Sequence, residues 1–157
     1  MSTRNWISLI IVMLGITFCA CTNESDKWKD LNEKFLENNK TKNGVVTLKD
    51  GLQYKILTQG VGLKPTVGSY VQIVYSGKLI DGTVFDTTMN DTTWVNTASS
   101  SYVSSYVAGF QEALTRMNTG SRWEVYIPQS LGYGSDGYGT IPSYSTLIFD
   151  VQLIGFK

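Results

Sequence analysis

The chain has 157 residues, of which 42% are hydrophobic and 12% aromatic, enough apolar material for one domain with a packed core. Its 13 basic and 13 acidic residues balance without forming a basic block, so nothing in the charge pattern indicates a nucleic-acid partner. The sequence contains no histidine, which excludes Ser–His and Cys–His nucleophilic systems and histidine-based metal sites.

The first twenty residues have the pattern of a secretory signal. Arg4 precedes an apolar run over residues 6–18, which is shorter than the ~20 residues that span a bilayer. Ala20 and Cys21 follow, and this ending resembles a bacterial lipoprotein signal in which Cys21 becomes the acylated first residue. Cys19 is an alternative acceptor, and a plain signal peptide or membrane stub with incidental cysteines is the alternative for the segment. We therefore expect residues 1–20 to be a signal peptide and the mature protein to be lipid-anchored in the bacterial cell envelope, at the outer membrane.

A tether and a short helix are expected next. Residues 22–27 are polar and predict a flexible tether. Apolar side chains then recur at helical spacing: Trp28, Leu31, Phe35 and Leu36. The pattern predicts an amphipathic helix that ends near Asn39 and either docks on the domain or pairs with a second copy. Residues 21–43 thus form the expected tether and helical stalk, and residues 44–157 the expected domain.

Strand patterns begin the domain. Residues 52–58 alternate as a strand does, and a loop rich in Gly and Pro follows over residues 60–68. In the next segment, residues 69–79, apolar side chains share one face: Val71, Ile73, Tyr75 and Leu79. Asp81-Gly82 predicts a turn. Residues 87–105 are rich in Ser, Thr and Asn and predict an irregular edge strand with a mobile loop.

One helix is expected within the domain, followed by two more strands. The helix is expected to begin at Phe110 and to end at Gly120. Four apolar side chains at helical spacing form one stripe along it: Phe110, Ala113, Leu114 and Met117. Residues 122–127 and 146–154 alternate as strands, separated by Pro128 and a loop rich in Gly and Tyr that runs to Ser145. This pattern predicts an α+β fold in which the helix covers one face of an antiparallel sheet. The loop matches G-x-G-x-x-G over residues 132–137, but a terminal strand follows instead of a helix, so a dinucleotide site is not favoured.

Four ordered blocks resemble the FKBP-type peptidyl-prolyl cis-trans isomerase family. They are Val74-Tyr75-Ser76-Gly77-Lys78-Leu79 with Asp81-Gly82 and Phe85-Asp86; Gly109-Phe110-Gln111-Glu112-Ala113-Leu114; Ile127-Pro128 with Leu131-Gly132-Tyr133-Gly134; and Ile141-Pro142 with Thr146-Leu147-Ile148-Phe149-Asp150-Val151. The resemblance implies an α+β fold with a five- to six-stranded antiparallel sheet wrapped around one short helix, here preceded by the helical stalk. It also implies rotation of X-Pro amide bonds in exported polypeptides, without a cofactor or a metal. Proline-containing polypeptides are the implied partners, and macrolides are a further implied ligand class. A non-catalytic proline-peptide-binding or chaperone module on the same fold is the alternative function.

The resemblance also assigns site residues. It implies a catalytic pocket formed by Tyr75, Phe85, Asp86, Phe110, Tyr133 and Phe149, with substrate-binding positions at Trp94, Tyr106, Val107, Tyr138 and Ile141. Phe110 would form the floor, Tyr133 and the Val107 N–H would donate hydrogen bonds, and Asp86 would accept at the rim. The chain departs from the family at Phe110, where Trp is usual, and at Tyr106, Tyr138 and Ser143.

The proposed reaction agrees with the residues that the chain offers. Rotation about an amide transfers no proton or group, so it requires no acid, base or nucleophile. Strand alternation alone places Tyr75 and Phe149 on the helix side of their strands. A purely structural core is the alternative reading of these aromatic residues. It explains Tyr75, Asp86 and Tyr133 less well, because hydroxyls and carboxylates are poor core groups unless they are paired or open onto a cavity.

Overall fold

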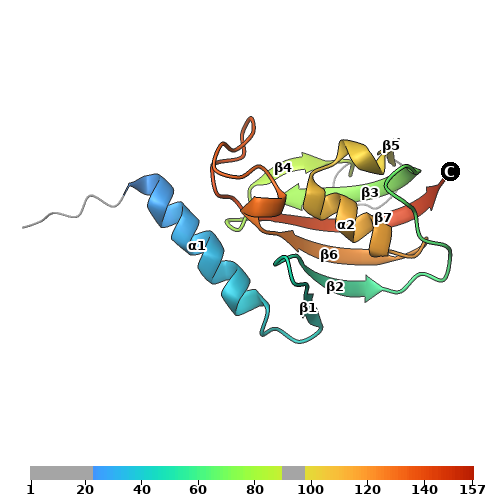
Figure 1. The fold of residues 1–157 in the computed structure, drawn as a ribbon, viewed down its shortest axis with the longest axis horizontal. Coiled ribbons are helices and arrows are strands. Elements are labelled where there is room, and N and C mark those ends of the chain that lie inside the picture. Colours follow the sequence, from blue (N-terminus) through green and yellow to red (C-terminus); the bar gives the residue numbers. More distant parts are fainter. Residues whose placement is uncertain (1–22, 90–97) are drawn as a thin grey trace, which may run out of the picture.

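The computed structural model describes residues 23–89 and 98–157. The predicted signal segment, both cysteines and Trp94 lie outside the described residues. The described elements are, in chain order, α1 Glu24–Asn39, β1 Val45–Thr47, β2 Gln53–Thr58, β3 Tyr70–Lys78, β4 Val84–Thr87, β5 Ser99–Tyr102, the 3₁₀ turn η1 Val103–Ser105, α2 Ala108–Arg116, β6 Arg122–Ile127, the 3₁₀ turn η2 Gln129–Leu131 and β7 Leu147–Phe156 (Figure 1). Neither α-helix is long and apolar enough to cross a bilayer, a finding restricted to these described residues.

One antiparallel sheet organises the domain. Its strand order is β1-β2-β6-β7-β3-β4, and β5 also pairs with β3. The described strands number seven rather than the five or six expected, because the three-residue β1 and the four-residue β4 and β5 extend the sheet beyond its long strands. The result is the predicted α+β class with an antiparallel sheet.

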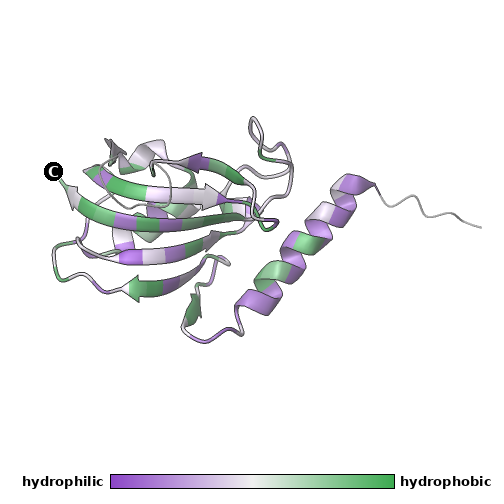
Figure 2. Ribbon diagram, turned by 180° about the vertical axis from the view of Figure 1, so that it is seen from behind, coloured by the Kyte–Doolittle hydropathy of each residue, from purple (hydrophilic) through white to green (hydrophobic). Residues whose placement is uncertain are grey.

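The core lies between the inner face of the sheet and α2, which crosses that face (Figure 1). Hydropathy alternates along the strands in Figure 2 as the pleat requires. The inward side chains of the long strands are buried: Val71, Ile73, Tyr75, Trp123, Val125, Ile127, Leu147, Phe149, Val151 and Leu153. The inward orientation predicted for Tyr75 and Phe149 therefore agrees with the structure.

Helix α2 differs from its predicted bounds at both ends. It begins at Ala108, because the Val107 carbonyl already accepts from the amides of Phe110 and Gln111. It ends at Arg116, and Met117 is the C-cap with an extended ψ of 135°. Met117 nevertheless remains fully buried, so its apolar side chain serves the core from outside the helix.

The tether predicted over residues 22–27 is wrong from Glu24 onward, because α1 begins there. Asn23 caps the helix by accepting from the Ser25 amide at 3.3 Å, and Glu24 and Asp26 place negative charge in its first turn. The apolar stripe predicted for this helix is wrong at Leu31, whose side chain is 53% exposed.

Two asparagines of α1 are buried against the domain instead. Asn32 accepts a hydrogen bond from the Thr146 amide, and Asn39 donates one to the Gln53 side chain at 3.0 Å. Phe35 meets Tyr126 on the outer face of the sheet, with 6.0 Å between ring centroids. In the described structure α1 is therefore docked on the domain, which is one of the two arrangements that its sequence pattern allows.

Candidate functional site

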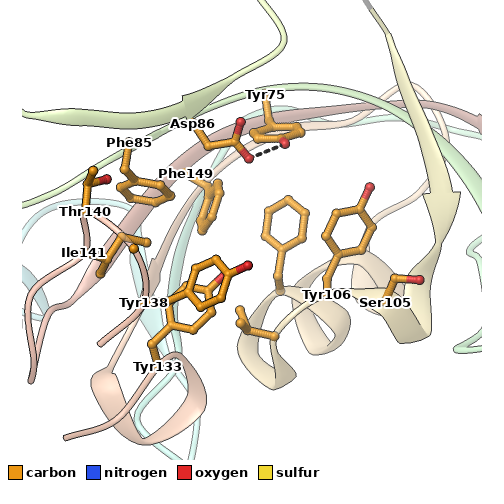
Figure 3. A pocket seen from close by; sticks show the side chains of 13 residues that line it. Tyr75, Phe85, Asp86, Ser105, Tyr106, Tyr133, Tyr138, Thr140, Ile141 and Phe149 are labelled. Atoms are coloured by element: carbon orange, nitrogen blue, oxygen red, sulfur yellow. Dashed lines mark hydrogen bonds between the residues drawn. The ribbon is translucent and has the colours of Figure 1, made fainter. Parts of the chain in front are cut away.

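A cavity of about 600 Å³ opens between the inner face of the sheet, the start of α2 and the loop that joins β6 to β7 (Figure 3). Its volume falls within the range of ~300–1,000 Å³ that is usual for small-ligand pockets. The lining residues are Tyr75, Phe85, Asp86, Ser105, Tyr106, Val107, Phe110, Tyr133, Tyr138, Gly139, Thr140, Ile141 and Phe149.

Two paired strands and an edge strand build one wall of the cavity. Phe149 of β7 lies opposite Gly77 of β3, and Gly77 also pairs with Asp86 of β4. A Cβ at Gly77 would lie 2.7 Å from the Phe85 ring and 2.8 Å from the Phe149 ring. The missing side chain thus allows these two rings to meet edge to face over the strand, at 5.5 Å between centroids.

Phe110 forms the deepest aromatic surface. It stands in the first turn of α2 and is only 1% exposed. Its ring centroid lies 4.5 Å from that of Phe149, 5.0 Å from that of Tyr106 and 6.0 Å from that of Tyr75. These contacts join the strand wall and the helix into one continuous aromatic surface.

The polar side of the cavity centres on Tyr75 and Asp86. The Tyr75 hydroxyl donates to Asp86 Oδ2 at 2.6 Å, as the dashed line in Figure 3 shows. Burial, together with this hydrogen bond to a carboxylate, raises the pKa of Tyr75 well above its ordinary value. Burial also raises the pKa of both Tyr106 and Tyr133, so all three phenols remain protonated donors at neutral pH.

The lining holds hydrogen-bond donors that have no acceptor in the described part of the chain, among them the Tyr106 hydroxyl, the Val107 amide and the Tyr133 hydroxyl. The Val107 amide precedes the first turn of α2 as its N-cap and donates to no described residue. The Tyr133 hydroxyl likewise makes no hydrogen bond to the residues that the structure describes. Both the Val107 amide and the Tyr133 hydroxyl can therefore bind the carbonyl oxygens of a ligand without first losing an acceptor among the described residues.

The loop between β6 and β7 forms the opposite wall. Tyr133 and Tyr138 stack with ring centroids 5.0 Å apart and an interplanar angle of 13°. Tyr138 and Ile141 exchange two backbone hydrogen bonds of 3.0 and 2.8 Å, which close a tight turn. Gly137 has a φ of +69°, and a Cβ there would lie 2.4 Å from the Ile141 carbonyl oxygen, so this turn requires glycine.

The structure gathers the predicted site residues that it describes into this one cavity: Tyr75, Phe85, Asp86, Tyr106, Val107, Phe110, Tyr133, Tyr138, Ile141 and Phe149. Trp94 lies outside the described residues. The sequence reasoning missed Ser105, Gly139 and Thr140, although each adjoins a predicted lining residue in the chain. Within residues 23–89 and 98–157, no group of three or more Asp, Glu or Cys side chains is arranged to hold a metal ion.

Comparison with known proteins gives matches along most of the chain. A family model described as FKBP-type peptidyl-prolyl cis-trans isomerase matches residues 62–154. A second, described as the domain amino terminal to FKBP-type peptidyl-prolyl isomerase, matches residues 20–56. The chain is 45% identical over 124 residues to the peptidyl-prolyl cis-trans isomerase Mip of Coxiella burnetii, covering 78% of this chain and 52% of that protein. It is 42% identical over 135 residues to the outer membrane protein MIP of Legionella longbeachae, covering 85% of this chain and 56% of that protein.

A solved structure shares the fold over nearly its whole length. The peptidyl-prolyl cis-trans isomerase of Pseudomonas syringae matches with a TM-score of 0.76 at 30% identity, covering 86% of this chain and 97% of that one. By contrast, the chain spans about half the length of the two curated relatives. Since the first family model extends over more than half of the chain and its fold is present, this chain belongs to the FKBP-type peptidyl-prolyl cis-trans isomerase family.

Proposed function

We propose that this protein catalyses cis–trans isomerisation of X-Pro bonds and thereby assists the folding of exported polypeptides. The observation that carries the proposal is the cavity itself, an apolar aromatic surface with hydrogen-bond donors at its wall and a Tyr75–Asp86 pair at its rim. Family membership and the isomerase names of the relatives support the same activity.

The chemical task is to lower a rotational barrier. Twisting an X-Pro amide costs ~20 kcal/mol because the partial double bond must be broken. Each ~1.4 kcal/mol removed from the barrier gives a tenfold gain in rate, so a thousandfold acceleration requires about 4 kcal/mol. The twisted amide is less charge-separated than the planar one, so it loses less hydration free energy on transfer from water to an apolar surface.

The lining residues suit this task. We expect the proline ring to pack on the continuous aromatic surface in which Phe85 contacts Phe149 and Phe149 contacts Phe110. The Val107 amide and the Tyr133 hydroxyl donate to carbonyls that flank the bond and hold the peptide in the twisted geometry. Tyr75 keeps the Asp86 carboxylate at the rim, where it remains exposed as an acceptor.

The remaining predicted positions belong to substrate recognition in this proposal. Tyr106, Tyr138 and Ile141 line the same cavity and would contact residues on either side of the proline. Macrolides are a further ligand class that this apolar cavity would accept, and one that binds there should inhibit the reaction competitively. The N-terminal lipid anchor and an outer-membrane location extend the proposal, supported by the signal pattern before Cys21 and by the name of the Legionella longbeachae relative.

A proline-limited refolding assay tests the activity. The purified protein should accelerate the slow, proline-dependent phase of a denatured test protein at substoichiometric concentration, and leave the fast phases unchanged. A rate equal to that in buffer would refute the enzymatic proposal. Binding of a proline peptide without any acceleration would instead assign the receptor or chaperone function that the sequence leaves as the alternative.

A further inference from the structure

Helix α1 contacts the last residues of the loop that joins β6 to β7. The Trp28 indole Nε1–H donates to Ser145 Oγ at 2.9 Å, and Asn32 Oδ1 accepts from the Thr146 amide at 2.7 Å. One residue earlier in the loop, the Tyr144 ring lies under the Lys29 ammonium, 5.1 Å from Nζ to the ring centroid. Three side chains from consecutive turns of one helix therefore meet three consecutive residues of the loop.

Of these contacts, the two hydrogen bonds are directional and lie in largely buried surroundings. Asn32, Ser145 and Thr146 are exposed by only 2%, 3% and 1%. Asn32 Nδ2 also donates to the Trp28 carbonyl at 2.8 Å, which fixes the orientation of the amide that receives the Thr146 N–H. Removing the Asn32 side chain leaves the buried Thr146 amide without its acceptor, and removing the Trp28 donor leaves Ser145 Oγ with only the Pro142 carbonyl as its partner among the described residues. Both changes cost more than the loss of an exposed contact.

The contacts continue from α1 to the cavity. Ser145 Oγ, which accepts from Trp28, donates in turn to the Pro142 carbonyl at 2.7 Å. Pro142 follows Ile141, a lining residue whose backbone is bonded across the turn to Tyr138. On the other side, the Tyr144 amide donates to the Gly134 carbonyl at 2.8 Å, next to Tyr133. The loop wall is thereby connected to α1 through hydrogen bonds and the short stretches of chain between them.

We propose that α1 is a positioning element for the cavity, with Trp28 and Asn32 holding the β6–β7 loop in the conformation that binds substrate. Neither residue lines the cavity, so each acts through Ser145 and Thr146. The expected effect of these two residues on activity rests on the proposed isomerase function. Their expected effect on the conformation of the loop does not depend on that function.

Amide hydrogen exchange and steady-state kinetics on the full chain test this inference. Trp28→Phe keeps an aromatic ring but removes the donor, and Asn32→Ala removes the acceptor of the Thr146 N–H. In both variants the amides of Tyr138, Ile141 and Tyr144 should exchange about three- to tenfold faster, while those of β3 keep their parental rates. The KM for a proline peptide should rise by about three- to tenfold, with kcat within about twofold of the parent.

Leu31→Ala is the matched control on the same helix. Leu31 is 53% exposed and belongs to none of these contacts, so its variant should retain parental loop exchange and KM. A double-mutant cycle adds a second control. Because Trp28 acts through Ser145, Trp28→Phe combined with Ser145→Ala should be no more impaired than Ser145→Ala alone.

The outcomes separate this inference from the proposed function. Parental loop exchange and KM in both Trp28→Phe and Asn32→Ala would overturn the positioning role, even if the enzyme is active. Additive effects in the double-mutant cycle would overturn the route through Ser145. If the parent protein shows no isomerase activity, the proposed function fails. The connection between helix and loop is then rejected only if the loop amides of the variants exchange at the parental rate.

Discussion

Phe149 combines two roles at the scale of a single residue, because its ring is both core and cavity wall. It contacts Tyr75, Phe85 and Phe110, with centroid distances of 5.9, 5.5 and 4.5 Å, and is 7% exposed. We expect Phe149→Ala to lower the free energy of unfolding by about 3–5 kcal/mol, because the neighbouring rings cannot close the space that it leaves. Urea denaturation measures this, with Leu63→Ala, 81% exposed, as the control that should change it by less than about 0.5 kcal/mol. A fully stable Phe149→Ala variant would contradict the packing described here.

The Tyr133 hydroxyl provides a smaller and more specific test. It is a donor on the cavity wall that has no acceptor among the described residues, so Tyr133→Phe should remove one hydrogen bond to the substrate and leave the fold intact. We expect kcat/KM to fall about two- to tenfold, which corresponds to ~0.5–1.5 kcal/mol. Tyr102→Phe is the control, since Tyr102 is 55% exposed on β5 and does not line the cavity. An unchanged kcat/KM in Tyr133→Phe would remove that hydroxyl from the mechanism.

Tyrosines with a raised pKa make stability depend on alkaline pH, and Tyr75 and Tyr126 are the two among the described residues that also donate to a carboxylate. Burial and a hydrogen bond to a carboxylate raise the pKa of Tyr75 and of Tyr126 far above the ordinary value, with Asp86 and Glu124 as the respective acceptors. Below a pH of ~10 these phenols are neutral in both the folded and the unfolded chain. Above it the unfolded chain releases protons that the folded chain retains, so the free energy of unfolding should fall as the pH rises.

Urea midpoints at about pH 8 and about pH 10.5 measure this pH dependence. Tyr126→Phe should make the decrease smaller, because that variant has one phenol fewer to ionise on unfolding. The Tyr126 variant is preferable to one at Tyr75, since Tyr126 lies outside the cavity. A decrease of the same size in the parent and in Tyr126→Phe would show that other groups cause it.

At the scale of elements, the absence of a side chain at Gly77 decides how β3, β4 and β7 come together at the cavity. Gly77→Ala places a methyl group within 2.8 Å of both the Phe85 and the Phe149 rings, which must move apart. We expect a loss of about 1–3 kcal/mol in unfolding free energy and a weaker affinity for proline peptides. Gly155→Ala in β7 is the matched control, because a Cβ there meets nothing within 4 Å. Equal stability and peptide affinity in the two variants would show that the close approach of the rings is unimportant.

The elements also differ in how well the sequence predicts them. The period-2 pattern of the long strands predicts β6 without error and places Tyr75 and Phe149 inward, because a buried sheet face enforces strict alternation. The apolar stripe of α1 predicts its docked face only in part. Trp28 and Phe35 of the stripe contact the domain, whereas Leu31 is exposed. Asn32, which the stripe does not include, is buried. A polar residue can occupy a buried position when its partners are aligned, and those partners, the Thr146 amide and the Trp28 carbonyl, belong to the tertiary structure and to the helix backbone.

At the scale of the whole molecule, the N-terminal segment predicts where the protein works. If Cys21 carries the lipid, Cys21→Ala should move the protein from the membrane fraction to the soluble fraction, since the acyl chains supply the membrane affinity. Cys19→Ala is the control and should leave the protein in the membrane fraction. Cell fractionation with detergent phase separation measures both. Release of the Cys19 variant with retention of the Cys21 variant would assign the anchor to Cys19 instead.

The sequence by itself determined the fold class, most of the strands and the family blocks that carry the site. These features depend on local alternation and on short motifs, which are present in the chain before it folds. It also named most of the residues that line the cavity, although only through resemblance to a family, because the lining residues lie on separate segments between Tyr75 and Phe149.

Only the tertiary structure decided that those segments converge on one cavity, and that Gly77 leaves room for the two rings that meet there. It also decided that α1 docks through Trp28 and Asn32 onto the end of the β6–β7 loop. Each of these features depends on contacts between residues far apart in the chain. Such contacts form only when the strands pair in their final register, and no local pattern in the sequence specifies the distances between them.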